Sequence, residues 1–205
     1  MSANYVIKIL TLGDTNVGKS SIVLRFVCDK FEDKMFSTIG IDFKSKFIKI
    51  GNQSIKVLLW DTAGQEKFQN IAKQYYNGAN GVFLVFDITD RKSFERIDFW
   101  LKELKEHNKL EELHVVLVGN KIDNEDKRVI KYEEANNYAK TNNIKYYEVS
   151  AKTNKGLNTL FNETIKEATK KVLSKMEQSE DYDDKLRLSI LDKNEFSSKK
   201  NRCCF

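Results

Sequence analysis

Residues 13–20, which read GDTNVGKS, constrain the fold of this chain more than any other segment. They match the pattern G-x-x-x-x-G-K-[ST], and they lie between the apolar, β-branched run at residues 6–12 and a helix-like run at residues 19–29. In that position the backbone N–H groups of the loop can surround a phosphate, and the helix N-terminus adds a favourable dipole. Lys19 would reach the β- and γ-phosphates. An ordinary glycine turn with a surface lysine is the alternative, and the flanking strand and helix disfavour it. The loop alone does not choose between ATP and GTP.

Strand-like and helix-like segments alternate between about residues 5 and 176. Two runs, at residues 43–50 and 55–60, alternate apolar and other residues around Gly51-Asn52, which is typical of an antiparallel hairpin. The short apolar runs suited to buried strands are residues 82–87, 115–120 and 145–149, and the amphipathic, helix-like runs are residues 94–106, 132–141 and 157–176. The order predicts an α/β fold with a mostly parallel six-stranded sheet, one antiparallel edge strand and helices on both faces.

Length and composition predict one domain with a tail. The chain has 205 residues, of which 40% are hydrophobic, enough for a single buried core. We expect the domain to span residues 1–177, because residues 178–205 are polar and charged with only scattered apolar positions, which is typical of a flexible tail. A short packed helix around residues 185–191 is the alternative for part of that tail. No apolar stretch approaches the roughly 20 residues of a membrane-spanning helix, and no secretory signal is visible.

Charge and cysteine content exclude further classes. The 35 Lys and Arg residues against 30 Asp and Glu residues give a net charge of +5, with both signs interspersed. Without a basic stripe carrying stacking aromatic residues, binding of nucleic acid is not expected. Three cysteines, two of them the adjacent Cys203 and Cys204, cannot form a disulfide framework and indicate a reducing, cytosolic environment.

A second motif, residues 58–66 (LLWDTAGQE), ends another apolar strand. The carboxylate of Asp61 can hold Mg²⁺, directly or through water, opposite the hydroxyl of Ser20. Gly64 lets a backbone N–H approach the γ-phosphate, and the amide of Gln65 can orient an attacking water. A strand end followed by a capped turn is the alternative. Two features favour a nucleoside triphosphatase over this alternative. They are the distance in sequence between this motif and the phosphate loop, and the Gly-Gln pair near the end of the motif.

A third motif, residues 118–123 (VGNKID), predicts which base is bound. Asp123 can accept hydrogen bonds from both N1–H and the N2 amine of guanine, whereas adenine would leave the carboxylate unpaired. Sites that depend on such bonds discriminate by about 10⁴–10⁵. Lys121 can lay its alkyl chain along the base, and Asn120 can connect this loop to the phosphate loop. An Asn- and Asp-rich turn is the alternative. Residues 150–152 (SAK) add a backbone N–H able to meet guanine O6.

These motifs and several further segments resemble the Ras superfamily of small GTPases and, within it, the Rab family. The resemblance covers about residues 5–176 and the C-terminal cysteines. The Rab-like segments are residues 37–43 (STIGIDF), 60–68 (WDTAGQEKF), 75–79 (YYNGA) and 84–89 (LVFDIT). The resemblance implies the P-loop small GTPase fold and hydrolysis of GTP to GDP and phosphate with Mg²⁺. It also implies regulation of vesicle-mediated intracellular protein transport, and the chain is most similar to Rabs of secretory traffic. Intrinsic hydrolysis should be slow, because no motif positions an arginine in cis.

The resemblance also implies roles for single residues. Thr38 belongs to switch I and ligates Mg²⁺ only in the GTP state, and Phe31 lies against the guanine. The metal set is Ser20, Thr38 and Asp61, and the catalytic set is Gln65 and Lys19. With the motifs, the nucleotide-binding set is Thr15, Asn16, Val17, Gly18, Lys19, Ser20, Ser21, Phe31, Thr38, Gly64, Asn120, Lys121, Asp123, Ser150, Ala151 and Lys152. Effectors are expected at Ile39, Phe43, Trp60 and Tyr75, for which ordinary core aromatics at a sheet edge are the alternative.

The C-terminal residues resemble the double prenylation site of Rab proteins. Cys203 and Cys204 follow the basic residues Lys199, Lys200 and Arg202, and only Phe205 follows them, so this is no C-a-a-X box. A dithiol or a metal pair is the alternative. The resemblance implies geranylgeranyl anchors on the cytoplasmic face of vesicle, Golgi or plasma membranes, with a cytosolic pool. It also implies a monomer and the partners of this family: an exchange factor, a GTPase-activating protein, effectors, a GDP-dissociation inhibitor and a prenylation escort.

The sequence departs from the family's pattern at two places, and two other functions compete with GTP hydrolysis. Thr15-Asn16 stands where the family often has Ser-Gly or Ser-Ala, which can tune hydrolysis, and Asn77 stands where many Rabs have Arg. A P-loop ATPase or nucleotide kinase is one rival, and the base motif disfavours it. A module that holds GTP without hydrolysing it is the other, and Gln65 and Thr38 disfavour it.

Overall fold

The structure is a computed structural model of the chain, and it describes residues 5–33, 38, 40–50, 53–64, 76, 78–107 and 112–178. The chain divides into two compact units, Met1–Lys171 and Val172–Phe205. In the second unit the described residues are 172–178, the end of the last helix. The predicted domain boundary after residue 177 stays a prediction.

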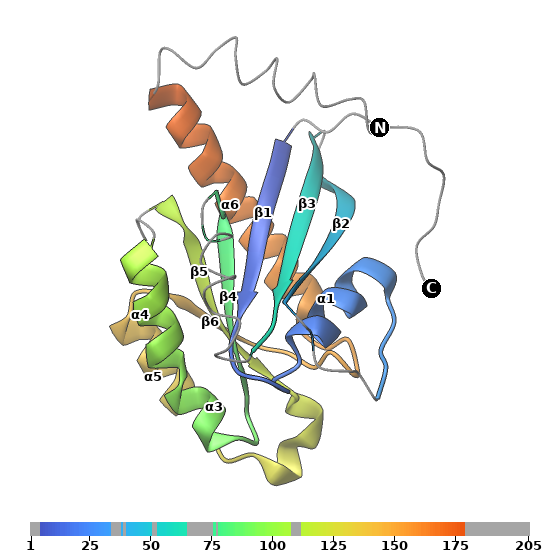
Figure 1. The fold of residues 1–205 in the computed structure, drawn as a ribbon, viewed down its shortest axis with the longest axis vertical. Coiled ribbons are helices and arrows are strands. Elements are labelled where there is room, and N and C mark those ends of the chain that lie inside the picture. Colours follow the sequence, from blue (N-terminus) through green and yellow to red (C-terminus); the bar gives the residue numbers. More distant parts are fainter. Residues whose placement is uncertain are drawn as a thin grey trace. The chain divides into compact units, whose positions relative to one another are not determined.

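A six-stranded sheet forms the centre of the first unit (Figure 1). Its strands are β1 (Tyr5–Leu12), β2 (Ile41–Ile50), β3 (Gln53–Thr62), β4 (Gly81–Asp87), β5 (His114–Asn120) and β6 (Lys145–Glu148). The order is β2-β3-β1-β4-β5-β6; β2 pairs with β3 in an antiparallel ladder, and the other four pairings are parallel. This confirms the predicted sheet, including the antiparallel strand β2 at its edge.

The helices follow the predicted runs with one difference. They are α1 (Lys19–Cys28), α3 (Arg91–Glu95), α4 (Ile97–His107), α5 (Tyr132–Thr141) and α6 (Leu157–Gln178), with a 3₁₀ segment η3 (Ile122–Lys127). Sequence periodicity predicted one helix over residues 94–106, whereas α3 and α4 are separate. The break lies at Arg96, the residue that caps α3 at its C-terminus and donates its backbone N–H to the carbonyl oxygen of Lys92 at 3.0 Å. Of the described helices, none combines the length and the hydropathy that crossing a membrane requires.

Strand β4 shows how the core is built on both faces of the sheet. All seven of its residues are buried, as expected for a central parallel strand covered by helices on both faces. Leu84 and Phe86 pack in one cluster with Ile97 and Trp100 of α4. The Phe83 ring faces the other way and meets Phe161 of α6, 5.2 Å between centroids. Figure 1 shows α3, α4 and α5 on one side of the sheet and α1 on the other.

The carboxyl ends of the parallel strands meet at one edge of the sheet. Gly13 follows β1, Thr62 ends β3, Asp87 ends β4 and Asn120 ends β5. In open α/β sheets, ligands bind outside this edge. The fold therefore gathers the three sequence motifs at one place.

Candidate nucleotide-binding site

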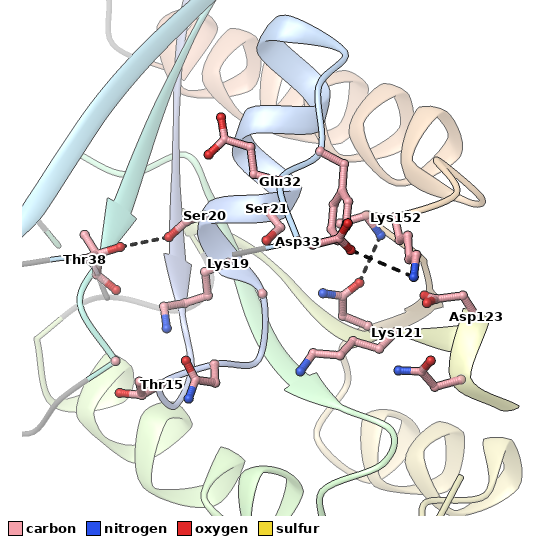
Figure 2. Close-up of a pocket in the computed structure, with 18 residues that line it drawn as sticks. Thr15, Lys19, Ser20, Ser21, Glu32, Asp33, Thr38, Lys121, Asp123 and Lys152 are labelled. Carbon is pink, nitrogen blue, oxygen red and sulfur yellow. Dashed lines mark hydrogen bonds and ion pairs between the residues drawn. The ribbon is translucent and has the colours of Figure 1, made fainter. Parts of the chain in front are cut away.

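A cavity of about 380 Å³ lies at this carboxyl edge (Figure 2). It brings together most of the predicted nucleotide-binding residues, namely Thr15, Asn16, Gly18, Lys19, Ser20, Ser21, Phe31, Thr38, Gly64, Asn120, Lys121, Asp123, Ala151 and Lys152. Sequence reasoning missed four further lining residues, which are Glu32, Asp33, Thr62 and Asn124. Two predicted residues, Val17 and Ser150, are buried behind the wall of the cavity and do not line it.

The phosphate loop has the backbone conformations that its glycines allow. Gly13 has φ of 143° and Gly18 has φ of 93°, both positive, and a Cβ on Gly18 would lie 2.3 Å from the side-chain nitrogen of Asn120. Asn16 also has a positive φ of 64°. Asn tolerates this left-handed region better than most residues do. The departure at Asn16 is therefore compatible with the loop's backbone.

Lys19 is almost completely buried at the floor of the site. Its Nζ atom donates hydrogen bonds to the carbonyl oxygens of Gly13 (2.9 Å) and Asp14 (2.7 Å). Burial lowers the pKa of Lys19 to about 8, and the carboxylates of Asp61 and Asp14 oppose that shift. A bound phosphate anion would favour the charged ammonium again. The lysine is thus held within the loop, where it can meet phosphate oxygens.

The three predicted metal ligands form one hydrogen-bonded chain. The hydroxyls of Ser20 and Thr38 are hydrogen-bonded at 2.8 Å, a contact that Figure 2 marks with a dashed line. Thr38 also donates to Asp61 Oδ2 at 3.3 Å. Thr11 donates to the other carboxylate oxygen at 3.3 Å. Burial raises the pKa of Asp61, while hydrogen bonds from Ser20, Thr38 and Thr11 oppose the rise. Asp61 lies behind the two hydroxyls and does not itself line the cavity.

This donor set fits Mg²⁺ rather than a transition metal. Within the described residues there is no group of three or more His, Cys, Asp and Glu side chains that could hold a metal ion. Two hydroxyls and one carboxylate are hard oxygen donors. Mg²⁺ is commonly bound by one or two protein oxygens together with substrate phosphates and water.

Asn120 connects the loops of the site. Its side chain is buried; Nδ2 donates to the carbonyl oxygen of Val17 at 2.9 Å, and Oδ1 accepts from the backbone N–H of Ala151 at 3.2 Å. The connection to the phosphate loop inferred from the sequence is present. The Ala151 N–H is already used, so a guanine O6 at this place must share it or use another donor of residues 150–152.

The loops that contain Asp123 and residues 150–152 are connected to each other and to α1. Ser150 Oγ donates to Asp123 Oδ1 at 2.6 Å, which orients the carboxylate. Arg25 of α1 donates to the carbonyl oxygens of Ala151 (2.9 Å) and Lys152 (2.8 Å). The role of Ser150 is thus one of support, and Arg25 is a supporting residue for which the sequence offered no motif.

Helix α4 also supports the phosphate loop, through a residue that the motif leaves variable. Asp14 Oδ1 accepts hydrogen bonds from Trp100 Nε1 (2.9 Å) and Arg96 Nε (3.1 Å). Gly64 also packs on the phosphate loop. A Cβ added to Gly64 would lie 2.4 Å from the carbonyl carbon of Asp14 and 2.4 Å from the backbone nitrogen of Thr15. These contacts couple Gly64 of the second motif, Arg96 and Trp100 of α4 to the phosphate loop.

Of the predicted effector residues, the structure describes two. Phe43 on β2 is 47% exposed, and its ring lies 5.2 Å from that of the partly buried Trp60. Phe43 is therefore no core residue.

Five further predicted positions lie outside the described residues, namely Ile39, Gln65, Tyr75, Cys203 and Cys204.

Comparison with known proteins places the chain in a family. A model described as "Ras family" matches residues 8–170. Among the relatives, "GTP-binding protein ypt2" of Schizosaccharomyces pombe is 42% identical over 160 residues, which cover 78% of this chain and 80% of the relative. "Ras-related protein Rab-13" of Mesocricetus auratus is 44% identical over 159 residues, 78% of each chain. "Ras-related protein Rab-1" of Theileria annulata is 43% identical over 168 residues, 82% of this chain and 76% of the relative. The chain belongs to the Ras family of small GTPases and, within it, to the Rab proteins, which bind and hydrolyse GTP in vesicle trafficking.

Proposed function

We propose that this chain is a membrane-anchored switch that alternates between GTP and GDP in the cavity at the carboxyl edge of the sheet. One observation carries the proposal: a single cavity gathers residues from the phosphate loop, the metal motif and the base motif. The Asn120–Val17 hydrogen bond joins two of these motifs across 103 positions of sequence.

The phosphates would occupy the part of the cavity lined by Thr15, Asn16 and Gly18. The backbone N–H groups of the loop and the ammonium of Lys19 supply positive charge there, and α1 begins at Lys19 with its N-terminus toward the same place. In phosphoryl transfer such groups stabilise the charge that develops on the transferred oxygens. Lys19 is thus assigned to both binding and catalysis.

Mg²⁺ would be held by the hydroxyls of Ser20 and Thr38, with Asp61 behind them. In this structure those hydroxyls bond each other, so binding of the ion would replace that bond. When bound, the ion neutralises charge on the β- and γ-phosphates. Asp61 accepts from Thr38 already and would orient the ligands from behind.

Guanine would lie between Lys121 and Phe31, with Asp123 facing its N1–H and N2 amine. Asp123 is fixed by Ser150, and Phe31, Lys121 and Lys152 all line this part of the cavity. A fixed carboxylate gains two bonds to guanine and would lack both against adenine. This arrangement supports GTP over ATP as the substrate.

Hydrolysis is assigned to an attacking water that Gln65 orients. No described arginine lines the cavity, which supports slow intrinsic turnover and a need for a GTPase-activating protein. The remaining partners of the proposal are an exchange factor, effectors that bind Ile39, Phe43, Trp60 and Tyr75, a GDP-dissociation inhibitor and a prenylation escort. Geranylgeranyl groups on Cys203 and Cys204, in a tail of residues 178–205, would hold the 1–177 domain on secretory membranes.

The test is single-turnover release of phosphate from Mg²⁺·GTP by the full chain. Wild-type protein should release phosphate slowly, and Gln65→Leu should slow release at least tenfold while binding GTP within about threefold of wild type. Ser20→Asn should weaken GTP binding with Mg²⁺ more than GDP binding. Release that is insensitive to both substitutions would contradict the assigned chemistry, and equal turnover of ATP would favour the rival ATPase.

A further inference from the structure

Lys121 and Asp87 form an ion pair beside the cavity. The Nζ atom of Lys121 lies 2.7 Å from Oδ2 of Asp87. Lys121 lines the cavity, whereas Asp87 is buried at the end of β4, with 6% of its surface exposed, and does not line it. In Figure 2 the side chain of Lys121 is extended along the cavity. The pair therefore joins a proposed base-contacting residue to a carboxylate of the Rab-like segment 84–89, to which the sequence assigned no role.

We propose that Asp87 is a positioning residue for guanine recognition, because it holds the ammonium of Lys121 and so fixes the alkyl chain that faces the base. This inference rests on the proposed function, since it assigns Lys121 to the guanine side of the site. It adds a residue from a different strand to the recognition of the base. Asp87 acts through Lys121 and makes no contact with nucleotide.

Asp87 can hold Lys121 because its own carboxylate is fixed. Oδ1 accepts from the backbone N–H and from the hydroxyl of Thr89, both at 2.8 Å, while Oδ2 meets Lys121. The backbone of Asp87 is in parallel register with Asn120, the residue before Lys121. The two strand ends thus place carboxylate and lysine at a set separation. The carboxylate cannot rotate without breaking its bonds to Thr89.

Burial makes the pair effective. The Asp87 side chain is 9% exposed and the Lys121 side chain 33% exposed, so salt screens this pair less than a surface pair. If Lys121 turned away, Asp87 would keep a buried charge without a counter-ion, which is unfavourable. A lysine that is already ordered loses less side-chain entropy when the base arrives. The expected result of the pairing is tighter guanine nucleotide binding.

The competing account is that Asp87 only stabilises the turn between β4 and α3. Its backbone N–H donates to Ser93 Oγ at 3.0 Å, and its Oδ1 holds Thr89. Asp87→Asn separates the two accounts, because asparagine keeps an acceptor for Thr89 and loses the charge that faces Lys121. Glu134→Gln is the matched control: it removes a carboxylate from an ion pair with Arg91, and neither residue lines the cavity.

The experiment is a double-mutant cycle on the full chain, with the dissociation constant for Mg²⁺·GDP as the readout. We expect Asp87→Asn to raise the GDP Kd about tenfold, and Glu134→Gln to leave it within about twofold. Lys121→Met keeps the alkyl chain and removes the ammonium. In that background Asp87→Asn should change the Kd less than about twofold, because the interaction through which it acts is gone. An unchanged Kd for Asp87→Asn, or an equal loss in both backgrounds, would overturn the proposal.

A second comparison needs no variant of Asp87 and covers the case in which Asp87→Asn does not fold. Lys121→Arg keeps a positive charge that can reach Asp87, so it should retain more GDP affinity than Lys121→Met. Equal losses would overturn the inference. Failure of the proposed function is seen separately, as wild-type protein that binds ADP as tightly as GDP. The other outcome is that wild-type protein shows the expected preference for GDP over ADP while the Asp87 and Lys121 variants do not behave as expected. In that case only the positioning role of Asp87 fails, and the proposed function stands.

Discussion

The side-chain amide of Asn120 donates a 2.9 Å hydrogen bond to the carbonyl oxygen of Val17, and its oxygen accepts from Ala151. One buried side chain thus joins the loops after β1, β5 and β6. Gly18 has to be glycine partly for the same reason, since its Cβ would lie 2.3 Å from the Asn120 amide nitrogen. The phosphate and base halves of the cavity are therefore held as one piece.

Replacing Asn120 tests that coupling. Asn120→Ala removes two buried hydrogen bonds, each worth about 1 kcal/mol, so GDP affinity should fall about 30-fold, mostly through faster dissociation. Asn137→Ala, at an exposed position of α5, is the control and should leave GDP affinity unchanged. The release rate of a fluorescent GDP analogue is the measurement. Equal release rates in the two variants would show that the connection between the loops is unimportant.

Gly64 is expected to tolerate no side chain in the arrangement seen here. Its Cβ would lie 2.4 Å from backbone atoms of Asp14 and Thr15, which cannot move aside as a side chain can. Overpacking of this kind costs about 2 kcal/mol, which corresponds to a fall of about 4–8 °C in the unfolding temperature of a chain this size.

Gly81→Ala is the comparison for Gly64→Ala. Its Cβ would meet the methyl group of Thr164 at 3.2 Å, a side-chain atom that can yield, so the loss should be smaller. Thermal unfolding in excess GDP is the measurement. An unfolding temperature of Gly64→Ala equal to that of wild type would show that this contact is absent in solution.

His114 should make the stability of the domain depend on pH. Its Nε2 atom is buried and has no hydrogen-bond partner among the described residues. Burial lowers the pKa of His114 below its ordinary value of 6.5; the ammonium groups of Lys171 and Lys145 lower it further, and the carboxylates of Glu167 and Glu163 oppose them. The unfolded chain therefore binds a proton more readily than the folded one, and stability should fall as the pH drops below about 6.5.

The measurement is the free energy of unfolding in urea between pH 5 and pH 7.5. His114→Gln should flatten this profile, because the titrating group is removed. The wild-type protein is the reference for the slope. Were His114→Gln to show the wild-type slope, the effect would belong to other groups.

The two C-terminal cysteines should decide membrane attachment. Cys203→Ser with Cys204→Ser should release the protein into the soluble fraction, because Lys199, Lys200 and Arg202 contribute only about 1 kcal/mol each near an anionic membrane. One remaining lipid chain binds only reversibly, so each single variant should be partly soluble. Cell fractionation is the measurement, with GTP hydrolysis in solution as the control. Retention of the double variant on membranes would reveal another anchor.

Local sequence patterns were sufficient to predict the sheet and the cavity. The alternation of apolar and other residues in 43–60 predicted the β2–β3 hairpin. The continuous apolar runs at 82–87 and 115–120 predicted the central parallel strands. Both predictions were possible because burial of a strand on one or both faces produces a recognisable apolar pattern in the sequence. The three motifs lie at the carboxyl ends of strands, so the parallel order of the sheet brings them together.

The supporting contacts could not be predicted in the same way. Asp14 meets Trp100, and Asp87 meets Lys121, through pairings of residues far apart in sequence that leave no local periodicity. The segment η3 is polar and 3₁₀, so an apolar pattern could not reveal it. The separation of α3 from α4 at Arg96 is likewise not encoded by a helical apolar pattern.

The proposed function depends on recognition of guanine by Asp123. The most direct test measures the binding of GDP, xanthosine diphosphate and ADP to wild-type protein and to Asp123→Asn in parallel. Wild type should prefer GDP over ADP by at least 10⁴. The substitution turns a double acceptor into a mixed donor and acceptor, so the affinity for GDP should fall at least 100-fold. The variant should then bind xanthosine diphosphate more tightly than it binds GDP. Unchanged GDP affinity with no gain for xanthosine diphosphate would contradict the account.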